Sequence, residues 1–204
     1  MNKIITISNI KGGVGKTTLS CNLAVALSKK YKVTVFDLDT TETSTEFFNN
    51  RDDIACYSDM SLQEFEDTLS KTDGIKIIDN AGYMSDLSVL ALFKSDLVIV
   101  PTMVETVDIS GAKATMRKYK DIAEQGISLN VKILPNKINP KTKQSTVEET
   151  LKCLGDFDIL PIVKNYTSYS KAFAKGLSII EYKKALPSTI DNFNVFVQGV
   201  LNEV

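Results

Sequence analysis

A segment rich in glycine and lysine near the N-terminus is the part of the sequence best suited to chemistry. Residues 11–18 follow an apolar run and open a helical pattern. Glycines let a backbone wrap so that successive N–H groups point inward, and a helix N-terminus adds partial positive charge, so the segment could hold a chain of phosphates. Lys16 is placed to meet the β- and γ-phosphates, and the Thr17 hydroxyl to bind Mg²⁺. The predicted nucleoside triphosphate site therefore comprises Lys11, Gly12, Gly13, Val14, Gly15, Lys16, Thr17 and Thr18.

Carboxylates follow two later apolar runs. Asp37 and Asp39 are two residues apart at the end of one run, and Asp79 ends another. Because the carboxyl ends of parallel strands meet at one edge of a sheet, these side chains should lie near the phosphate loop. The second run, which leads into Asp79 and then Gly82, looks like a Walker B strand. Such a strand end would hold Mg²⁺ through water at Asp79, while the backbone N–H of Gly82 senses the γ-phosphate.

The elements that must position these groups alternate along the chain. Strands are expected at residues 3–8, 32–37, 75–79, 97–101, 131–135 and 159–163, and helices at 16–30, 61–71, 85–93, 107–125 and 144–154. The strands are mostly continuous apolar runs, which is typical of strands covered on both faces. This alternation predicts an α/β fold, a mostly parallel twisted sheet flanked by helices, in a single domain over residues 1–204.

Composition excludes several kinds of chemistry. The chain has 204 residues, a formal net charge of −1 and no histidine, so histidine-ligated metals, imidazole bases and a histone-like polycation are excluded. Its three cysteines have no disulfide or Cys-x-x-Cys spacing, which indicates a reducing compartment. No signal peptide and no apolar run of about 18 residues is present, so we expect a cytoplasmic protein.

These motifs together resemble the ParA/MinD family of deviant Walker ATPases, whose loop signature is KGGVGKTT. Ile10 stands where an ordinary P-loop has its first glycine, and Lys11 brings a second lysine into the loop. In that family the additional lysine reaches the partner's phosphates across a nucleotide-sandwich dimer. The resemblance therefore implies a P-loop NTPase that uses ATP and Mg²⁺ and forms a homodimer with ATP, in which Lys11 acts in trans.

The resemblance also assigns roles to single residues. The family's Asp-x-Asp-Pro-Gln pattern makes Asp39 the residue that orients the attacking water and puts Asp37 near Mg²⁺, although Thr40 and Thr41 replace Pro-Gln. The implied catalytic residues are Lys11, Lys16 and Asp39, and the implied metal ligands are Thr17, Asp37 and Asp79. Asn136 follows the fifth expected strand, where these ATPases recognise adenine; a plain strand-end turn is the alternative.

The resemblance runs from Lys3 to about Tyr182 and is closest to short ParA partition ATPases that lack an N-terminal helix-turn-helix. It implies an ATP dimer that binds nonspecific DNA, associates with the nucleoid, and is released when a small centromere-binding or cargo adaptor protein stimulates slow hydrolysis. The outcome would be segregation of plasmids, chromosomes or other cargo. The candidate DNA-binding residues are Lys164, Lys171, Lys175, Lys183 and Lys184.

The alternative is a MinD-like positioning ATPase on a membrane. Residues 188–204 have an apolar helical stripe but no Lys or Arg, so the electrostatic half of membrane attachment is missing and a docked terminal helix is expected instead. Three further classes share the loop. An iron–sulfur reductase needs cysteines beside the nucleotide, which Cys21, Cys56 and Cys153 do not supply; an ATP-dependent ligase and a structural protein with an inactive site remain open.

Overall fold

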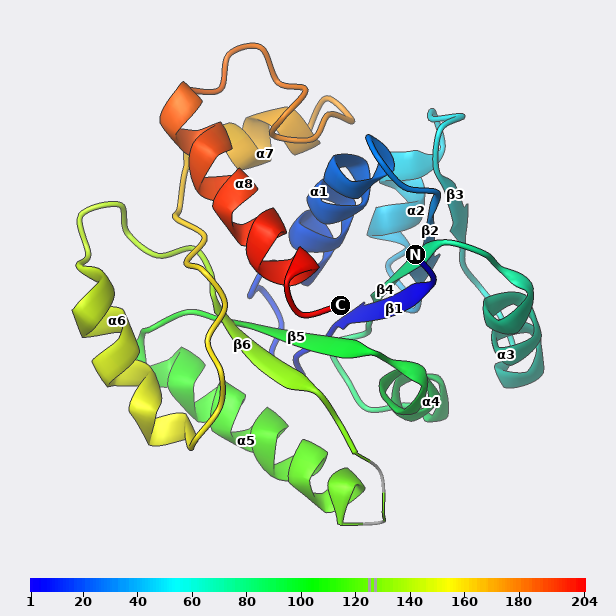
Figure 1. Ribbon diagram of the computed structural model, residues 1–204, viewed down its shortest axis with the longest axis horizontal. Coiled ribbons are helices and arrows are strands. Elements are labelled where there is room, and N and C mark those ends of the chain that lie inside the picture. The colour runs from blue at the N-terminus through cyan, green and yellow to red at the C-terminus, as the bar shows by residue number, and fades with distance from the viewer. Residues whose placement is uncertain (125, 127) are drawn as a thin grey trace.

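The computed structural model describes residues 1–204 except 125 and 127, and omits the side chains of 106–108. Six parallel strands form one sheet in the order β3-β2-β4-β1-β5-β6 (Figure 1). The strands are β1 Lys3–Ile7, β2 Val33–Asp37, β3 Ala55–Tyr57, β4 Ile75–Asp79, β5 Leu97–Thr102 and β6 Val131–Pro135. Since all pairs are parallel, every strand delivers its last residue to the same edge. The predicted single α/β domain is confirmed.

Helices cover both faces of the sheet. They are α1 Lys16–Ser28, α2 Thr43–Phe48, α3 Leu62–Lys71, α4 Asp86–Lys94, α5 Thr106–Ala123, α6 Gln144–Leu151, α7 Thr167–Phe173 and α8 Pro187–Leu201, with a 3₁₀ turn at Lys152–Leu154. In Figure 1, α1 and α8 lie on one face and α3, α4 and α5 on the other. Helix α6 lies beyond β6.

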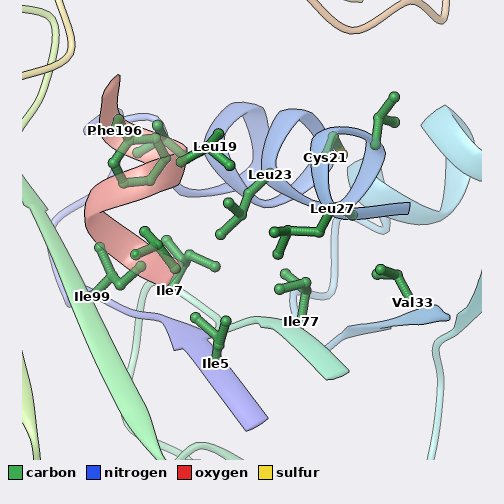
Figure 2. Packing of buried hydrophobic residues seen from close by; sticks show 14 of the residues in the cluster. Ile5, Ile7, Leu19, Cys21, Leu23, Leu27, Val33, Ile77, Ile99 and Phe196 are labelled. Atoms are coloured by element: carbon green, nitrogen blue, oxygen red, sulfur yellow. The ribbon is translucent and has the colours of Figure 1, made fainter. Parts of the chain in front are cut away.

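The strands alternate their side chains between two apolar layers. Ile5, Ile7 and Ile77 pack beneath α1 and α8 with Leu23 and Phe196 (Figure 2). Their neighbours face the opposite layer, where Phe36 and Ile78 pack with Phe65 and Leu69 of α3. Burial on both faces explains why the sequence of these strands is continuously apolar.

The strand expected at 159–163 is wrong. This segment forms one isolated bridge to the sheet, between Ile159 and Ile133 of β6, and a second bridge joins Lys164 to Ile138 just beyond both segments. Pro161 has no N–H to give to a ladder, which limits pairing to its neighbours. The other five expected strands are confirmed, while β3, α2 and α7 were not predicted.

The C-terminal helix is docked, as expected. Phe193, Phe196 and Val200 of α8 are fully buried in the layer that covers β1 and β5. Within the described part of the chain, no helix combines the length and apolarity needed to cross a membrane.

Candidate nucleotide-binding site

The glycine-rich loop lies between β1 and α1, at the edge where the strands end. Gly13 has φ 77° and Gly15 has φ 92°, a left-handed conformation that side chains with a Cβ adopt at a cost. A Cβ atom at Gly15 would also lie 2.7 Å from Nδ2 of Asn136. The loop conformation therefore depends on glycine at this position for two independent reasons.

Two side chains that follow β6 hold the loop from one side. Nδ2 of Asn136 donates to the carbonyl of Val14 at 2.7 Å, and Nζ of Lys137 donates to the carbonyl of Gly13 at 2.7 Å. In a trans peptide the next N–H points opposite to the carbonyl, so the N–H groups of Val14 and Gly15 point away from these anchors. Gly15 is the N-cap of helix α1 and provides no side-chain hydrogen bond, which leaves the first N–H groups of the helix for an anion. The loop is shaped to fit phosphates.

Asn136 is only 4% exposed and uses its amide nitrogen on the loop itself. It also lines a cavity of about 340 Å³ beside Thr18, together with Lys164, Tyr166 and other residues of segment 163–170. This cavity adjoins the phosphate loop and could hold a base and ribose. The predicted contact between Asn136 and adenine stays a prediction, but half of its amide is already committed.

Lys16 lies deep in the site. It is 8% exposed, and burial lowers its pKa although Asp79 and Asp39 oppose that shift. A Cβ at Gly82 would stand 3.6 Å from Nζ of Lys16, so the ammonium lies against the backbone that follows β4. The fold thus brings Lys16, Asp79 and Gly82 together, as the sequence predicts.

Asp79 is a buried carboxylate surrounded by hydroxyls. It is 1% exposed and accepts hydrogen bonds from Ser44 at 2.7 Å and Ser20 at 3.2 Å, while the Thr17 hydroxyl also bonds to it. Burial raises its pKa to about 6, and nearby Asp37 adds to the rise. A buried anion among hydroxyls fits Mg²⁺ held by Thr17 and, through water, by Asp79.

Ser20 and Ser44 were missed by the sequence analysis. Ser20 lies one helical turn after Lys16 and could have been found from that spacing. Ser44 lies in the unpredicted helix α2, so only the fold brings it to Asp79.

Asp37 has a different environment from Asp79. Its Oδ1 accepts the N–H of Asp39 at 3.1 Å, and its Oδ2 accepts the N–H of Thr45 at 2.9 Å and the Thr45 hydroxyl at 3.2 Å. It is 2% exposed, and burial raises its pKa. Both oxygens therefore hold the turn between β2 and α2, and the predicted metal contact of Asp37 would be added to this structural role.

Asp39 lies farther out, half-buried, within electrostatic range of Lys16. Its Oδ1 accepts hydrogen bonds from the N–H and the hydroxyl of Thr41, both at 3.0 Å. Thr41 thus closes the turn onto this carboxylate in place of the family's glutamine. The water-orienting role of Asp39 stays a prediction.

Lys11 leaves the loop toward a different neighbour from Lys16. A Cβ at Gly111 of α5 would lie 2.8 Å from Cδ of Lys11, so the aliphatic stem crosses α5 at that glycine. Below it, Oδ1 of Asn9 accepts the N–H of Lys11 at 2.9 Å, and Nδ2 of Asn9 donates to the carbonyl of Pro101. The two lysines of one loop therefore have different neighbours: Lys16 lies near Asp79 and Gly82, and Lys11 lies against α5.

Four of the five predicted DNA-binding lysines are exposed, and the fifth lies beside the nucleotide cavity. Lys171, Lys175, Lys183 and Lys184 are exposed in α7 and the segment before α8. Lys164 is half-buried beside the nucleotide cavity, and its backbone N–H donates to Oδ1 of Asn192.

A parallel sheet that delivers a glycine-rich loop, a buried lysine and a hydroxyl-surrounded carboxylate to one edge defines a P-loop nucleotide-binding protein. The chain belongs to the family described as the CobQ/CobB/MinD/ParA nucleotide binding domain, whose model matches residues 5–179. It is therefore a member of a nucleotide-binding ATPase family.

The chain is similar in sequence to named proteins and in fold to several solved structures. Maintenance of carboxysome distribution protein A from Gloeobacter kilaueensis is 25% identical over 189 residues, covering 89% of this chain and 85% of that protein. The ATP complex of McdA from Cyanothece superposes with a TM-score of 0.81 at 15% identity, covering 98% of this chain and 96% of the other. The cell division ATPase MinD from Pyrococcus furiosus gives a TM-score of 0.78 at 17% identity and covers 100% of both chains.

Proposed function

We propose that the chain is an ATPase switch of the ParA type. With ATP and Mg²⁺ two copies form a dimer, the dimer binds nonspecific DNA, and a partner protein stimulates slow hydrolysis that releases it. The cargo moved in this way would be a plasmid, a chromosome or another large assembly. The nucleotide acts by favouring one of two states, monomer or dimer.

The observation that carries the proposal is that the two lysines of the loop lie in different places. Lys16 lies at the buried centre with Asp79 and Gly82, where it would neutralise phosphates bound to its own chain. Lys11, half-buried at the start of the same loop, lays its aliphatic stem across α5 at Gly111 instead. A cation there is suited to reach a second copy's phosphates. The similarity to a carboxysome distribution protein supports the cargo-moving role.

The structure favours DNA over a membrane as the surface to which the dimer attaches. The apolar stripe of α8 is buried in the core, where it includes Phe193, Val197 and Val200. The exposed lysines of α7 and of the segment before α8 supply instead the positive charge that the phosphates of DNA attract.

The decisive experiment measures binding to a double-stranded DNA of arbitrary sequence with ATP, with ADP and without nucleotide, at two salt concentrations. We expect binding with ATP alone, weakening steeply as salt rises. Liposomes of anionic lipid serve as the comparison surface. Nucleotide-independent binding to DNA, or ATP-dependent binding to liposomes instead, would refute the proposal.

Substitution of Lys11 tests the dimer. Lys11→Ala should keep ATP affinity within about threefold but lose ATP-dependent dimerisation in analytical ultracentrifugation, because the substitution spares the buried centre of the site. Asp39→Ala should keep ATP-dependent dimerisation and accumulate an ATP dimer that hydrolyses little. Wild-type turnover in the first variant would count against action in trans.

A further inference from the structure

The outer face of α5 carries a groove that the nucleotide site does not use. The groove has a volume of about 620 Å³ and lies between α5, residues 129–131 and residues 153–157. Its floor is apolar: Met116 and Tyr119 of α5 are 5% and 3% exposed, and Leu154 and Phe157 close the opposite side. Figure 1 shows α5 on the outside of the molecule, with β6 and the end of α6 beside it.

The rim of this groove is cationic. Lys113, Arg117 and Lys120 are exposed and spaced four and three residues apart, so they form one row along α5. Among the described residues that line the groove, these three carry all of the charge. Nζ of Lys120 stands 4.0 Å from Glu124, but an exposed pair of this kind contributes little and is easily exchanged. The charge on the rim therefore calls for an acidic partner.

The floor is connected to residues 80–82, which follow β4 in the nucleotide site, through buried hydrogen bonds. The Tyr119 hydroxyl donates to Oγ of Ser8 at 2.6 Å, and Nδ2 of Asn80 donates to the same oxygen at 3.0 Å. Oδ1 of Asn80 accepts the N–H of Ala81 at 3.0 Å, and the next residue is Gly82, which faces Lys16. Three hydrogen bonds thus connect Tyr119 to the backbone beside Lys16.

We propose that this α5 groove, defined by Lys113, Met116, Arg117, Tyr119, Lys120, Leu154 and Phe157, docks an acidic amphipathic segment of the partner protein, and that Tyr119 passes the docking to residues 80–82. Apolar side chains of the segment fill the floor while its carboxylates meet the row of cations, as in helix-in-groove recognition. DNA would use the cations but leave the floor uncovered, which is why a peptide fits better. The stimulatory role of this partner rests on the proposed function; the docking itself does not.

The binding test uses a synthetic probe. A fluorescent amphipathic peptide with Leu and Phe on one face and Glu on its flanks is titrated with the protein, and the same peptide with Lys in place of Glu is the control. We expect saturable anisotropy for the Glu peptide alone. The exposed Cys153 at the edge of the groove should then react more slowly with iodoacetamide. Equal binding of both peptides, or none, would overturn the docking proposal.

Matched variants on one helix localise the binding. Arg117→Glu reverses a charge on the rim and should weaken the Glu peptide at least tenfold. Lys118→Glu makes the same change at an exposed neighbour that does not line the groove, and should stay within twofold of wild type. Equal losses would mean attraction by net charge alone. Displacement of the peptide by double-stranded DNA would identify the groove as a DNA surface and also refute the proposal.

The connection to the nucleotide loop needs a separate readout. Tyr119→Phe keeps the ring in the floor but removes the bond to Ser8. The variant should bind the peptide within twofold, whereas peptide-dependent change in hydrogen exchange at residues 80–82, present in the wild type, should disappear. No such change in the wild type would refute the connection. Because neither readout needs ATP turnover or DNA, failure of the proposed function would leave these results distinguishable.

Discussion

The nucleotide edge and the lysine-bearing segment before α8 contrast in how their charges are held. At the nucleotide edge, Asp37 and Asp79 are 2% and 1% exposed and their oxygens accept bonds from named hydroxyl and N–H groups. The four lysines of α7 and of the segment that follows it are instead exposed to solvent, namely Lys171, Lys175, Lys183 and Lys184. The first region is built for geometry and the second for charge.

This contrast implies two kinds of response to mutation. Where charges are buried, removal of one group leaves others without a partner, so effects should be large and specific to position. Where charges are exposed, each contributes a small, salt-screened amount, so effects should be small and cumulative.

The largest effect is expected at Lys16. Lys16→Ala removes the cation that would meet the phosphates within a buried site, and should weaken ATP binding at least about a hundredfold, or roughly 3 kcal/mol. Isothermal titration calorimetry measures the loss directly. Lys30→Ala, an exposed lysine beyond the other end of α1, is the matched control and should bind ATP like the wild type. Unchanged ATP affinity in Lys16→Ala would mean that the buried lysine does not bind the phosphates.

A pair of glycine variants compares the backbone of the phosphate loop with that of the segment between α7 and α8. Gly15→Ala meets both a left-handed φ of 92° and a Cβ 2.7 Å from Asn136, and should lower the free energy of unfolding by about 2–3 kcal/mol and also weaken ATP binding. Gly176→Ala, with φ 63° and open space around the new Cβ, should cost only about 1 kcal/mol and leave ATP affinity unchanged. Chemical denaturation and calorimetry test both. Equal costs would mean that Asn136 yields and does not hold the loop.

The parts of the site that could be predicted from sequence are the local ones. The loop and Asp79 each follow an apolar strand within a few residues, so their position at the sheet edge follows from fold rules. Of the partners of Asp79, Ser44 could not be found in the same way, because it belongs to a six-residue helix that is too short to show a periodicity. Likewise the attachment of Asn136 to Val14 joins residues far apart in the chain.

The fold was predictable for similar reasons. Strands buried on both faces are written as continuous apolar runs, and five of the six expected strands are confirmed. Edge strand β3 is three residues long and half exposed, so it leaves no such run. Segment 159–163 has the apolar run without the strand, since Pro161 limits its hydrogen bonds.

A third prediction concerns the ion pair between Arg51, which follows α2, and Glu181, which lies between α7 and α8. Both nitrogens of the Arg51 guanidinium donate to Glu181, at 2.9 and 2.8 Å, and Ser178 donates its N–H and hydroxyl to the same carboxylate. Burial alone would raise the pKa of Glu181, but the bonds from Arg51 and Ser178 outweigh it and hold that pKa at about 2. Glu181→Gln should therefore cost about 1–2 kcal/mol at neutral pH.

The pH dependence of that loss has a definite sign. Because the folded pKa of Glu181 lies below its ordinary value of 4.5, the stabilisation is complete above that value and is lost as pH falls from about 4.5 toward about 2. The difference in unfolding free energy between Glu181→Gln and the wild type should shrink from pH 6 to pH 3. A difference that stays constant over this range would assign the loss to packing.

The smallest effects are expected among the exposed lysines. Lys183→Gln should weaken ATP-dependent DNA binding only about twofold to threefold, reduce the slope of log affinity against log salt by about one, and leave the free energy of unfolding within about 0.5 kcal/mol of wild type. Lys71→Gln, an equally exposed lysine at the end of α3, is the control and should change neither quantity. Combining Gln at 171, 175, 183 and 184 should multiply the losses, since exposed sites act nearly independently. If Lys71→Gln weakened binding as much as Lys183→Gln, charge at any point of the surface would suffice, and the segment before α8 would have no special part in holding DNA.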